Sequence, residues 1–231
     1  MQLGNGEYLI ISSCIKGPYD SSKINRLIQE IKAMDATFGV VNLLNINPKK
    51  VDYNLVWEGI DDLSTSFSMD FLNQYVLSTL DLRFNNGIPA RLQILFLDEL
   101  SYEVSLIFNF TQLIDEENDN HLRTMRLEFI EKVAIVCFEK LNPLYGTYGV
   151  ERGVEAIESL IENVPGLPCD KVFYNKKLIN KSIILLELIN NAKFSKENSE
   201  GVYFRNSDLE DFQLVENDEL RMKLNELLKS F

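Results

Sequence analysis

Apolar and polar residues alternate along the chain in patterns that predict both strands and helices. Residues 8–13 form a first apolar run, which predicts a strand. Residues 20–22 then offer helix caps, and apolar residues recur on one helix face over 24–34. Residues 38–46 are rich in valine and leucine, end at an Asn-Pro pair and predict another strand. The chain therefore begins in a strand, helix, strand order.

The clearest strand pattern lies in the middle of the chain. Residues 91–96 and 102–111 each alternate between apolar and more polar side chains, as strands with one buried face do. Only a short connection, 98–100, separates the two runs, which favours an antiparallel hairpin. Parallel strands need much longer crossovers, so a purely parallel, doubly wound sheet is not expected.

The longest predicted helix covers about 120–141 and ends before Pro143, because the residue that precedes a proline is pushed out of the helical region. Its predicted apolar stripe consists of Leu122, Met125, Phe129, Val133, Val136, Cys137 and Leu141. A stripe of this length must be buried, so we expect the helix to pack across the sheet.

Further elements follow towards the C-terminus. Residues 145–149 predict a turn or short strand, 172–174 and 201–204 predict strands, and 153–162, 183–189 and 218–231 predict helices. We expect one α+β domain over residues 1–231, built on a mixed, largely antiparallel sheet with helices packed on it.

The segment 49–86 has the most ambiguous pattern. Phe67, Met69 and Phe71 alternate as in a strand, whereas Met69, Leu72, Val76 and Leu80 fit one face of a helix. We favour the helix.

Charge narrows the classes of function. Asp and Glu total 35 against 23 Lys and Arg, the net charge is -12, and His121 is the single histidine. Nucleic-acid affinity depends on clustered basic residues, and none are found, so no nucleic-acid partner is expected. A basic protein partner suits the composition better.

The apolar segments and the cysteines indicate the cellular compartment of the protein. The first seven residues lack the basic residues of a signal peptide, and the most apolar later stretch, 182–189, is far shorter than the roughly 20 residues of a membrane span. Cys14, Cys137 and Cys169 are odd in number and none form a C-x-x-C motif. We therefore expect a cytoplasmic protein without a membrane partner.

Four glutamates form the sharpest local pattern. Glu151, Glu155, Glu158 and Glu162 share one helix face if the helix begins by Glu151. Like charges at these spacings cost about 0.2–0.5 kcal/mol per pair, and a basic partner would relieve that repulsion. The alternative is a solvated acidic face, and a helix that starts after Gly153 would leave Glu151 out.

Tyr145 and Tyr148 are further candidates for partner binding, because tyrosine offers a large contact area at low entropy cost. Core packing at the exit of the long helix is the alternative. The neighbouring glycines do not follow the G-x-G-x-x-G order of a phosphate-binding loop.

Candidate chemistry is sparse. The four glutamates lack accompanying His or Cys ligands, so neither a metal nor another cofactor is expected. The sequence contains no G-x-S-x-G motif, which would indicate a serine nucleophile. A lone histidine near the start of a helix is more often incidental than catalytic, so we assign no catalytic residue. The alternative is an uncharacterised hydrolase or transferase that uses carboxylates or His121.

The long helix, the sequence Asn-Pro-Leu-Tyr-Gly at 142–146, Phe-Tyr-Asn at 173–175 and Gly-Val-Tyr-Phe at 201–204 resemble the C-terminal part of α+β immunity proteins from bacterial polymorphic-toxin systems. The resemblance covers about the last 110 residues. It implies a cytoplasmic antitoxin that covers the active surface of a toxin. An acidic inhibitor would suit a basic toxin, because complementary charge speeds association. The oligomeric state does not follow from the sequence.

Overall fold

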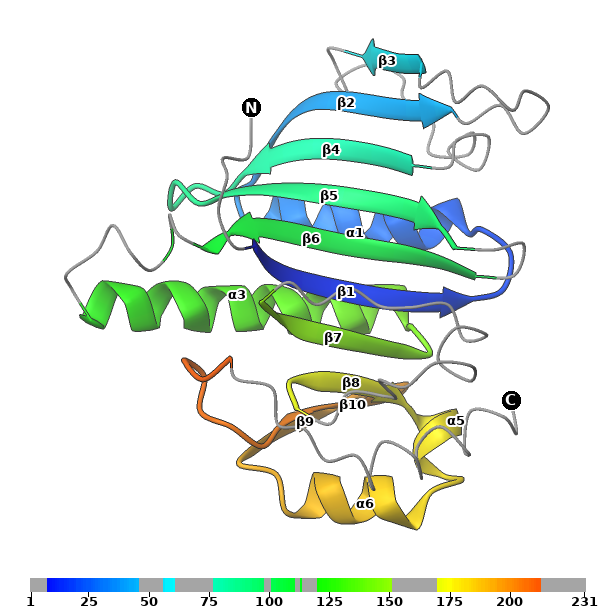
Figure 1. The fold of residues 1–231 in the computed structure, drawn as a ribbon, viewed down its shortest axis with the longest axis vertical. Coiled ribbons are helices and arrows are strands. Elements are labelled where there is room, and N and C mark those ends of the chain that lie inside the picture. The colour runs from blue at the N-terminus through cyan, green and yellow to red at the C-terminus, as the bar shows by residue number, and fades with distance from the viewer. Residues whose placement is uncertain are drawn as a thin grey trace.

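A computed structural model describes residues 8–45, 56–60, 77–97, 101–110, 113, 120–150 and 170–212 (Figure 1). Its elements in chain order are β1 (Tyr8–Lys16), α1 (Ser21–Ala33), β2 (Thr37–Asn45), β3 (Val56–Ile60), β4 (Leu77–Arg83), β5 (Pro89–Phe96), β6 (Ser101–Asn109), α3 (Asn120–Leu141), β7 (Tyr145–Val150), β8 (Val172–Asn175), α5 (Lys176–Ile179), α6 (Ile183–Asn190), β9 (Phe194–Glu197) and β10 (Gly201–Arg205).

The strands form one ten-stranded sheet in the order β3-β2-β4-β5-β6-β1-β7-β8-β10-β9. Each neighbouring pair in the described chain is antiparallel. The predicted hairpin is present, with Phe96 opposite Tyr102. Strand β6 lies inside the sheet between β5 and β1. The prediction of an α+β fold on a largely antiparallel sheet is confirmed.

Helices cover the two faces of the sheet at different places. The larger apolar cluster joins α1 and α3 to one face, where Ile28 and Ile130 share a core with Ile11 and Val104. Figure 1 shows α1 behind the strands. A smaller cluster lies on the other face, where α5 and α6 pack against β8 and β10. The predicted packing of the long helix on the sheet is therefore confirmed.

The start of α1 follows the sequence closely. The Asp20 side chain accepts a hydrogen bond from the Ser22 backbone N–H at 2.9 Å, which satisfies one of the free donors of the first turn. Four residues of the predicted face, Ile24, Leu27, Ile28 and Ile31, are buried.

The buried face of α3 differs from the predicted stripe. Val133, Cys137 and Leu141 are buried as expected, but Met125 is 51% exposed and Phe129 is half-buried. The remaining buried residues are Leu127, Ile130, Glu131, Ala134, Ile135 and Phe138. Helix α3 contacts α1 as well as β1 and β7, so it needs a broader apolar face than a single stripe.

Phe138 packs closely against the sheet because the facing residue is a glycine. Its ring stacks on Phe173 and Tyr203, with centroids 5.5 Å and 5.9 Å apart. A Cβ atom at Gly146 would lie 2.3 Å from the Phe138 ring, which is too close for any side chain. Gly146 therefore sets the distance between α3 and β7.

The helix favoured for part of 49–86 is wrong at its C-terminal end. Leu80, taken as a helical position, lies in strand β4, which pairs with both β2 and β5. Phe67, Met69, Leu72 and Val76 lie outside the described residues. Val56–Ile60 forms strand β3, which the pattern did not indicate.

The C-terminal part of the chain follows the predicted order with two additions. Residues 145–150, 172–175 and 201–205 are strands and Ile183–Asn190 is a helix, as predicted. The short helix α5 and the strand β9 were not predicted. The predicted helices at 153–162 and 218–231 lie outside the described residues.

The larger cluster includes residues from near both ends of the described chain, such as Leu9 and Tyr203, so these two parts of the chain share a core. The single domain over 1–231 stays a prediction. Among the residues described, no helix combines the length and apolar character needed to cross a membrane.

Candidate functional site

The two tyrosines predicted to bind a partner lie in the interior. Tyr145 and Tyr148 are each 1% exposed. Tyr145 belongs to the smaller apolar cluster, and the Tyr148 ring contacts Phe212 at 5.9 Å between centroids. Their assignment as interface anchors is corrected: both rings pack in the core, which was the alternative, and neither is presented to a partner in this conformation.

The structure says less about the other residues that were predicted to be functional. Glu151, Glu155, Glu158 and Glu162 lie outside the described residues. His121 is exposed on the first turn of α3. In the described ranges, no three His, Cys, Asp or Glu side chains come together in a way that could hold a metal ion.

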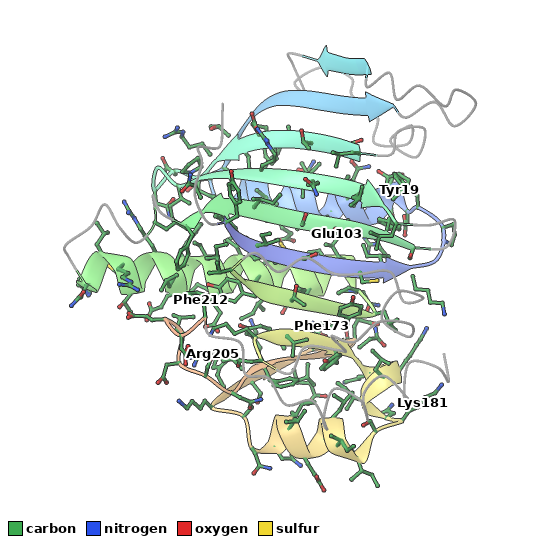
Figure 2. The ribbon with its side chains drawn as sticks, in the orientation of Figure 1. Tyr19, Glu103, Phe173, Lys181, Arg205 and Phe212 are labelled. Carbon is green, nitrogen blue, oxygen red and sulfur yellow. The ribbon has the colours of Figure 1, made fainter. Side chains whose placement is uncertain are left out.

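A buried charged group lies on the α3 side of the sheet, and we call Glu131, Tyr148, Tyr203 and Arg205 the Glu131 cluster. One oxygen of Glu131, Oε1, accepts hydrogen bonds from the Tyr203 hydroxyl at 3.0 Å and from Arg205 Nε at 2.9 Å. Tyr203 and Arg205 are two residues apart on β10 and so point to the same face. Arg205 also lies over the Phe194 ring, 5.2 Å from its centroid (Figure 2).

The phenols of this cluster are held in their neutral form. Burial raises the pKa of Tyr148, and the nearby Glu131 carboxylate raises it further. The same two causes raise the pKa of Tyr203. The Tyr148 hydroxyl is buried and has no hydrogen-bond partner among the residues that the structure describes. A phenol with a raised pKa is a poor general base at neutral pH.

A second buried group adjoins the first, and we call Asp170, Lys171 and Ser207 the Asp170 cluster. The Ser207 hydroxyl donates to Asp170 Oδ2 at 2.5 Å and accepts from Lys171 Nζ at 2.6 Å. Lys171 Nζ also donates to the Asp211 carbonyl and lies 4.8 Å from the centre of the Phe212 ring. Arg205 Nη1 donates to the Ser207 carbonyl at 2.9 Å, which joins the two clusters.

The contact between Ser207 and Lys171 resembles a serine nucleophile beside its base, but the hydrogen bonds run the wrong way. Lys171 donates to Ser207 instead of accepting its proton, and the Ser207 proton goes to Asp170. Lys171 and Ser207 are 2% and 7% exposed, which leaves little access for a substrate. Each cluster contains opposite charges in contact. The Glu131 cluster links α3 to β10, and the Asp170 cluster links the segment after β10 to the start of β8.

Replacement of Asp170 by asparagine is expected to lower the free energy of unfolding at neutral pH, by an amount that shrinks in acid. Burial raises the pKa of Asp170, but hydrogen bonds from Ser207 and the Asn206 backbone and the charge of Lys171 outweigh it and hold the pKa below 3.8. Because the folded pKa is the lower one, this stabilisation is present above about pH 4 and is lost as the pH falls further.

Urea unfolding of parent and variant over a pH series measures this effect. The difference between the two proteins should be largest near neutral pH and should close below about pH 4. A difference that stays constant into the acid range would mean that the Asp170 charge does not stabilise the fold.

The opposite face of the sheet carries a row of polar residues across five neighbouring strands. Their pairing places each directly opposite the next, in the order Thr79, Gln93, Ser105, Ser12, Thr147. Ser12 also donates a hydrogen bond of 2.5 Å to Glu103, which Figure 2 shows over the central strands. A shift of one residue in any strand would turn its polar residue to the apolar face, so the row helps to fix the register.

Neither buried cluster was predicted from the sequence. Their signal is a charged residue inside an apolar pattern: Glu131 follows Ile130 in the middle of α3, and Arg205 continues the strand Gly-Val-Tyr-Phe. A buried charge needs a partner, so such residues indicate that an ion pair is present. The sequence does not show which other residues form that pair.

No protein-family model, no curated protein and no solved structure matches this chain.

Proposed function

We propose that this chain is a non-enzymatic, acidic protein-binding module, most concretely an immunity protein that neutralises a cognate bacterial toxin. The proposed contact surface is the glutamate stripe of Glu151, Glu155, Glu158 and Glu162, and the proposed partner is a basic protein. The observation that carries the proposal is the uneven distribution of charge along the chain.

Residues 170–212 contain seven Lys and Arg and seven Asp and Glu, so they are neutral overall. The net charge of -12 is therefore carried by the rest of the chain, which includes the glutamate stripe. An excess of one sign in part of a molecule attracts partners of the opposite sign and disfavours wrong ones.

The buried ionisable groups also support binding over catalysis. Glu131 is held by Arg205 and Tyr203, and Asp170 is held by Ser207 and Lys171. A catalytic acid or base needs an open position at which a substrate can exchange a proton. In the described part of the chain, these two carboxylates are occupied by contacts within the protein.

Replacement of Glu155 and Glu158 by lysine is expected to slow association with the partner while leaving the fold intact. The stripe would lose its attraction for basic residues, and the remaining rate should depend less on salt, since screening reaches a Debye length of about 8 Å near physiological salt. The partner is captured from the native host with the parent chain, and association kinetics are then measured over a salt series.

Two controls sharpen the experiment. Replacement of Glu128 and Glu187 by lysine makes the same change of net charge at two exposed positions elsewhere, on α3 and α6. Equal slowing by both double variants would assign the effect to net charge and leave the stripe as a solvated face. His121→Ala should leave function intact, and a loss greater than tenfold in a folded protein would favour the enzymatic alternative.

A further inference from the structure

Strand β9 forms an open edge of the sheet in the part of the chain that the structure describes. It is the last strand in the sheet order and pairs only with β10 in the described chain. Ser195, Lys196 and Glu197 are all exposed. Figure 1 shows β9 and α6 together at one end of the molecule. An open edge presents backbone N–H and C=O groups that can pair with another strand.

The hydrogen bonds of the β9–β10 hairpin show which groups face outwards. The Asn198 N–H donates to the Gly201 carbonyl at 3.0 Å, so Asn198 and Gly201 face each other as a bonded pair. Bonded positions alternate along an antiparallel ladder, so Lys196 and Phe194 also point their backbone groups towards β10. The backbone groups of Ser195 and Glu197, and of Lys193 just before the strand, therefore point to the open edge.

Lysines on an edge strand ordinarily discourage pairing, but both lysines here are engaged within the chain. Lys193 Nζ lies 3.2 Å from Asp208 Oδ1, and Lys196 Nζ lies 3.8 Å from Glu139 Oε1. Residues 170–212 are neutral overall, so this end of the molecule does not add to the repulsion between two chains of net charge -12.

We propose that β9 joins two copies of this chain, antiparallel to each other about a two-fold axis at Ser195. This register places Ser195 opposite the second Ser195, and Lys193 opposite the second copy's Glu197 on both sides of the axis. These are the positions whose backbone groups face outwards, so each pair can exchange its two hydrogen bonds. Lys193 and Glu197 each have an exposed ion-pair partner within the chain, Asp208 at 3.2 Å and Lys176 at 2.9 Å. In this register the two opposite charges also face each other across the strand pair, which favours it.

Neighbouring registers are poorer. An axis at Lys193, Lys196 or Glu197 places each of these charges against its own copy, which destabilises a strand pair. An axis at Phe194 places Lys193 opposite Ser195 of the second copy. Lys193 then no longer faces Glu197, and the two opposite charges do not pair. The sequence of β9 is thus self-complementary in one register, as a two-fold interface between identical chains requires.

Helix α6 supplies apolar surface beside this edge. Ile183 is 75% exposed and Leu186 is 45% exposed, and both lie on the outer side of the helix. A two-fold axis perpendicular to the sheet keeps the two copies of α6 on the same face of the joined sheet. A pair of short strands is marginal by itself, so apolar side chains at the same end of the molecule favour a stable dimer.

A cysteine at Ser195 tests the axis directly. In this register the two Cα atoms would lie about 5.5 Å apart, within the range that a disulfide spans. We expect Ser195→Cys to give a covalent dimer under mild oxidation. Ser199→Cys is the matched control, because this exposed residue of the same hairpin would lie on the order of 25 Å from its copy. Crosslinking of Ser195→Cys no greater than that of Ser199→Cys, or of the parent chain with its own cysteines, would overturn the proposal.

Exchange of the charges at residues 193 and 197 tests the register in a second way. Sedimentation over a concentration series measures the dissociation constant of the dimer for each variant. Lys193→Glu and Glu197→Lys should each raise the dissociation constant of the dimer, by roughly 2- to 30-fold. The double exchange should restore it, because the opposite charges face each other again. A double variant weaker than either single variant, or a parent chain that is monomeric at every concentration, would contradict pairing through β9.

Discussion

Replacement of Phe138 by alanine is expected to destabilise the fold by about 3–5 kcal/mol. Phe138 is 1% exposed and lies between α3 and the sheet, where its ring stacks on Phe173 and Tyr203. The close approach allowed by Gly146 means that the surrounding backbone cannot easily collapse into the space left by the ring. The shift of the urea unfolding midpoint, at an unchanged denaturant dependence, measures this loss.

Phe129→Ala is the matched control on the same helix. Phe129 is half-buried and contacts Phe84 at 5.0 Å between ring centroids. We expect a loss of about 1–2 kcal/mol, since less surface returns to water. If Phe129→Ala costs as much as Phe138→Ala, the buried face of α3 has been assigned to the wrong residues.

Removal of Arg205 is the second change with a large expected effect. Arg205→Ala leaves Glu131, which is 8% exposed, without the cation that faces it. Loss of one member of a buried ion pair typically costs about 3–5 kcal/mol, because the other charge stays out of water without compensation. Arg205 is itself partly exposed, so we expect a loss near the lower end, about 3 kcal/mol.

The double-mutant cycle with Glu131 separates the ion pair from the other contacts of Arg205. Glu131→Met combined with Arg205→Met removes both charges and keeps most of the volume. The double variant should lose about 1–3 kcal/mol less than the sum of the two single variants. Simple additivity would show that the two side chains do not stabilise each other.

The sequence predicts those elements whose patterns are set locally. Helix α1 has a capping residue and one apolar face, and strands β5 and β6 alternate over most of their length, so each was placed correctly. The more polar face of β6 is nevertheless buried too, at Glu103, Ser105 and Asn109. Strand β9 escaped prediction because it contains one apolar residue, Phe194, and is exposed over most of its length. Leu80 has a helical spacing to Leu72 and Val76, but the pairing of β4 with β2 and β5 outweighs it.

The candidate site was less predictable for a physical reason. Tyr145 and Tyr148 lie in a short segment rich in glycine, where burial depends on α3 and β8 and not on the segment itself. The Glu131 cluster joins residues 72 and 74 positions apart in sequence. Helical and strand periodicity describe neighbours within one element, so they cannot show which distant elements meet.

The central position of β1 affects how the protein is made. The first strand of the chain pairs with β6 on one side and β7 on the other, with Tyr8 opposite Asn109 and Leu9 opposite Val150. At ordinary rates of translation, on the order of ten seconds pass between the synthesis of β1 and that of its second partner. Strand β6 is made before β7, so one side of β1 still lacks its native neighbour after the first has been synthesised, and the complete sheet must wait for long-range pairing. Until β7 is made, the edge of β1 that faces it presents backbone groups that can pair with another strand.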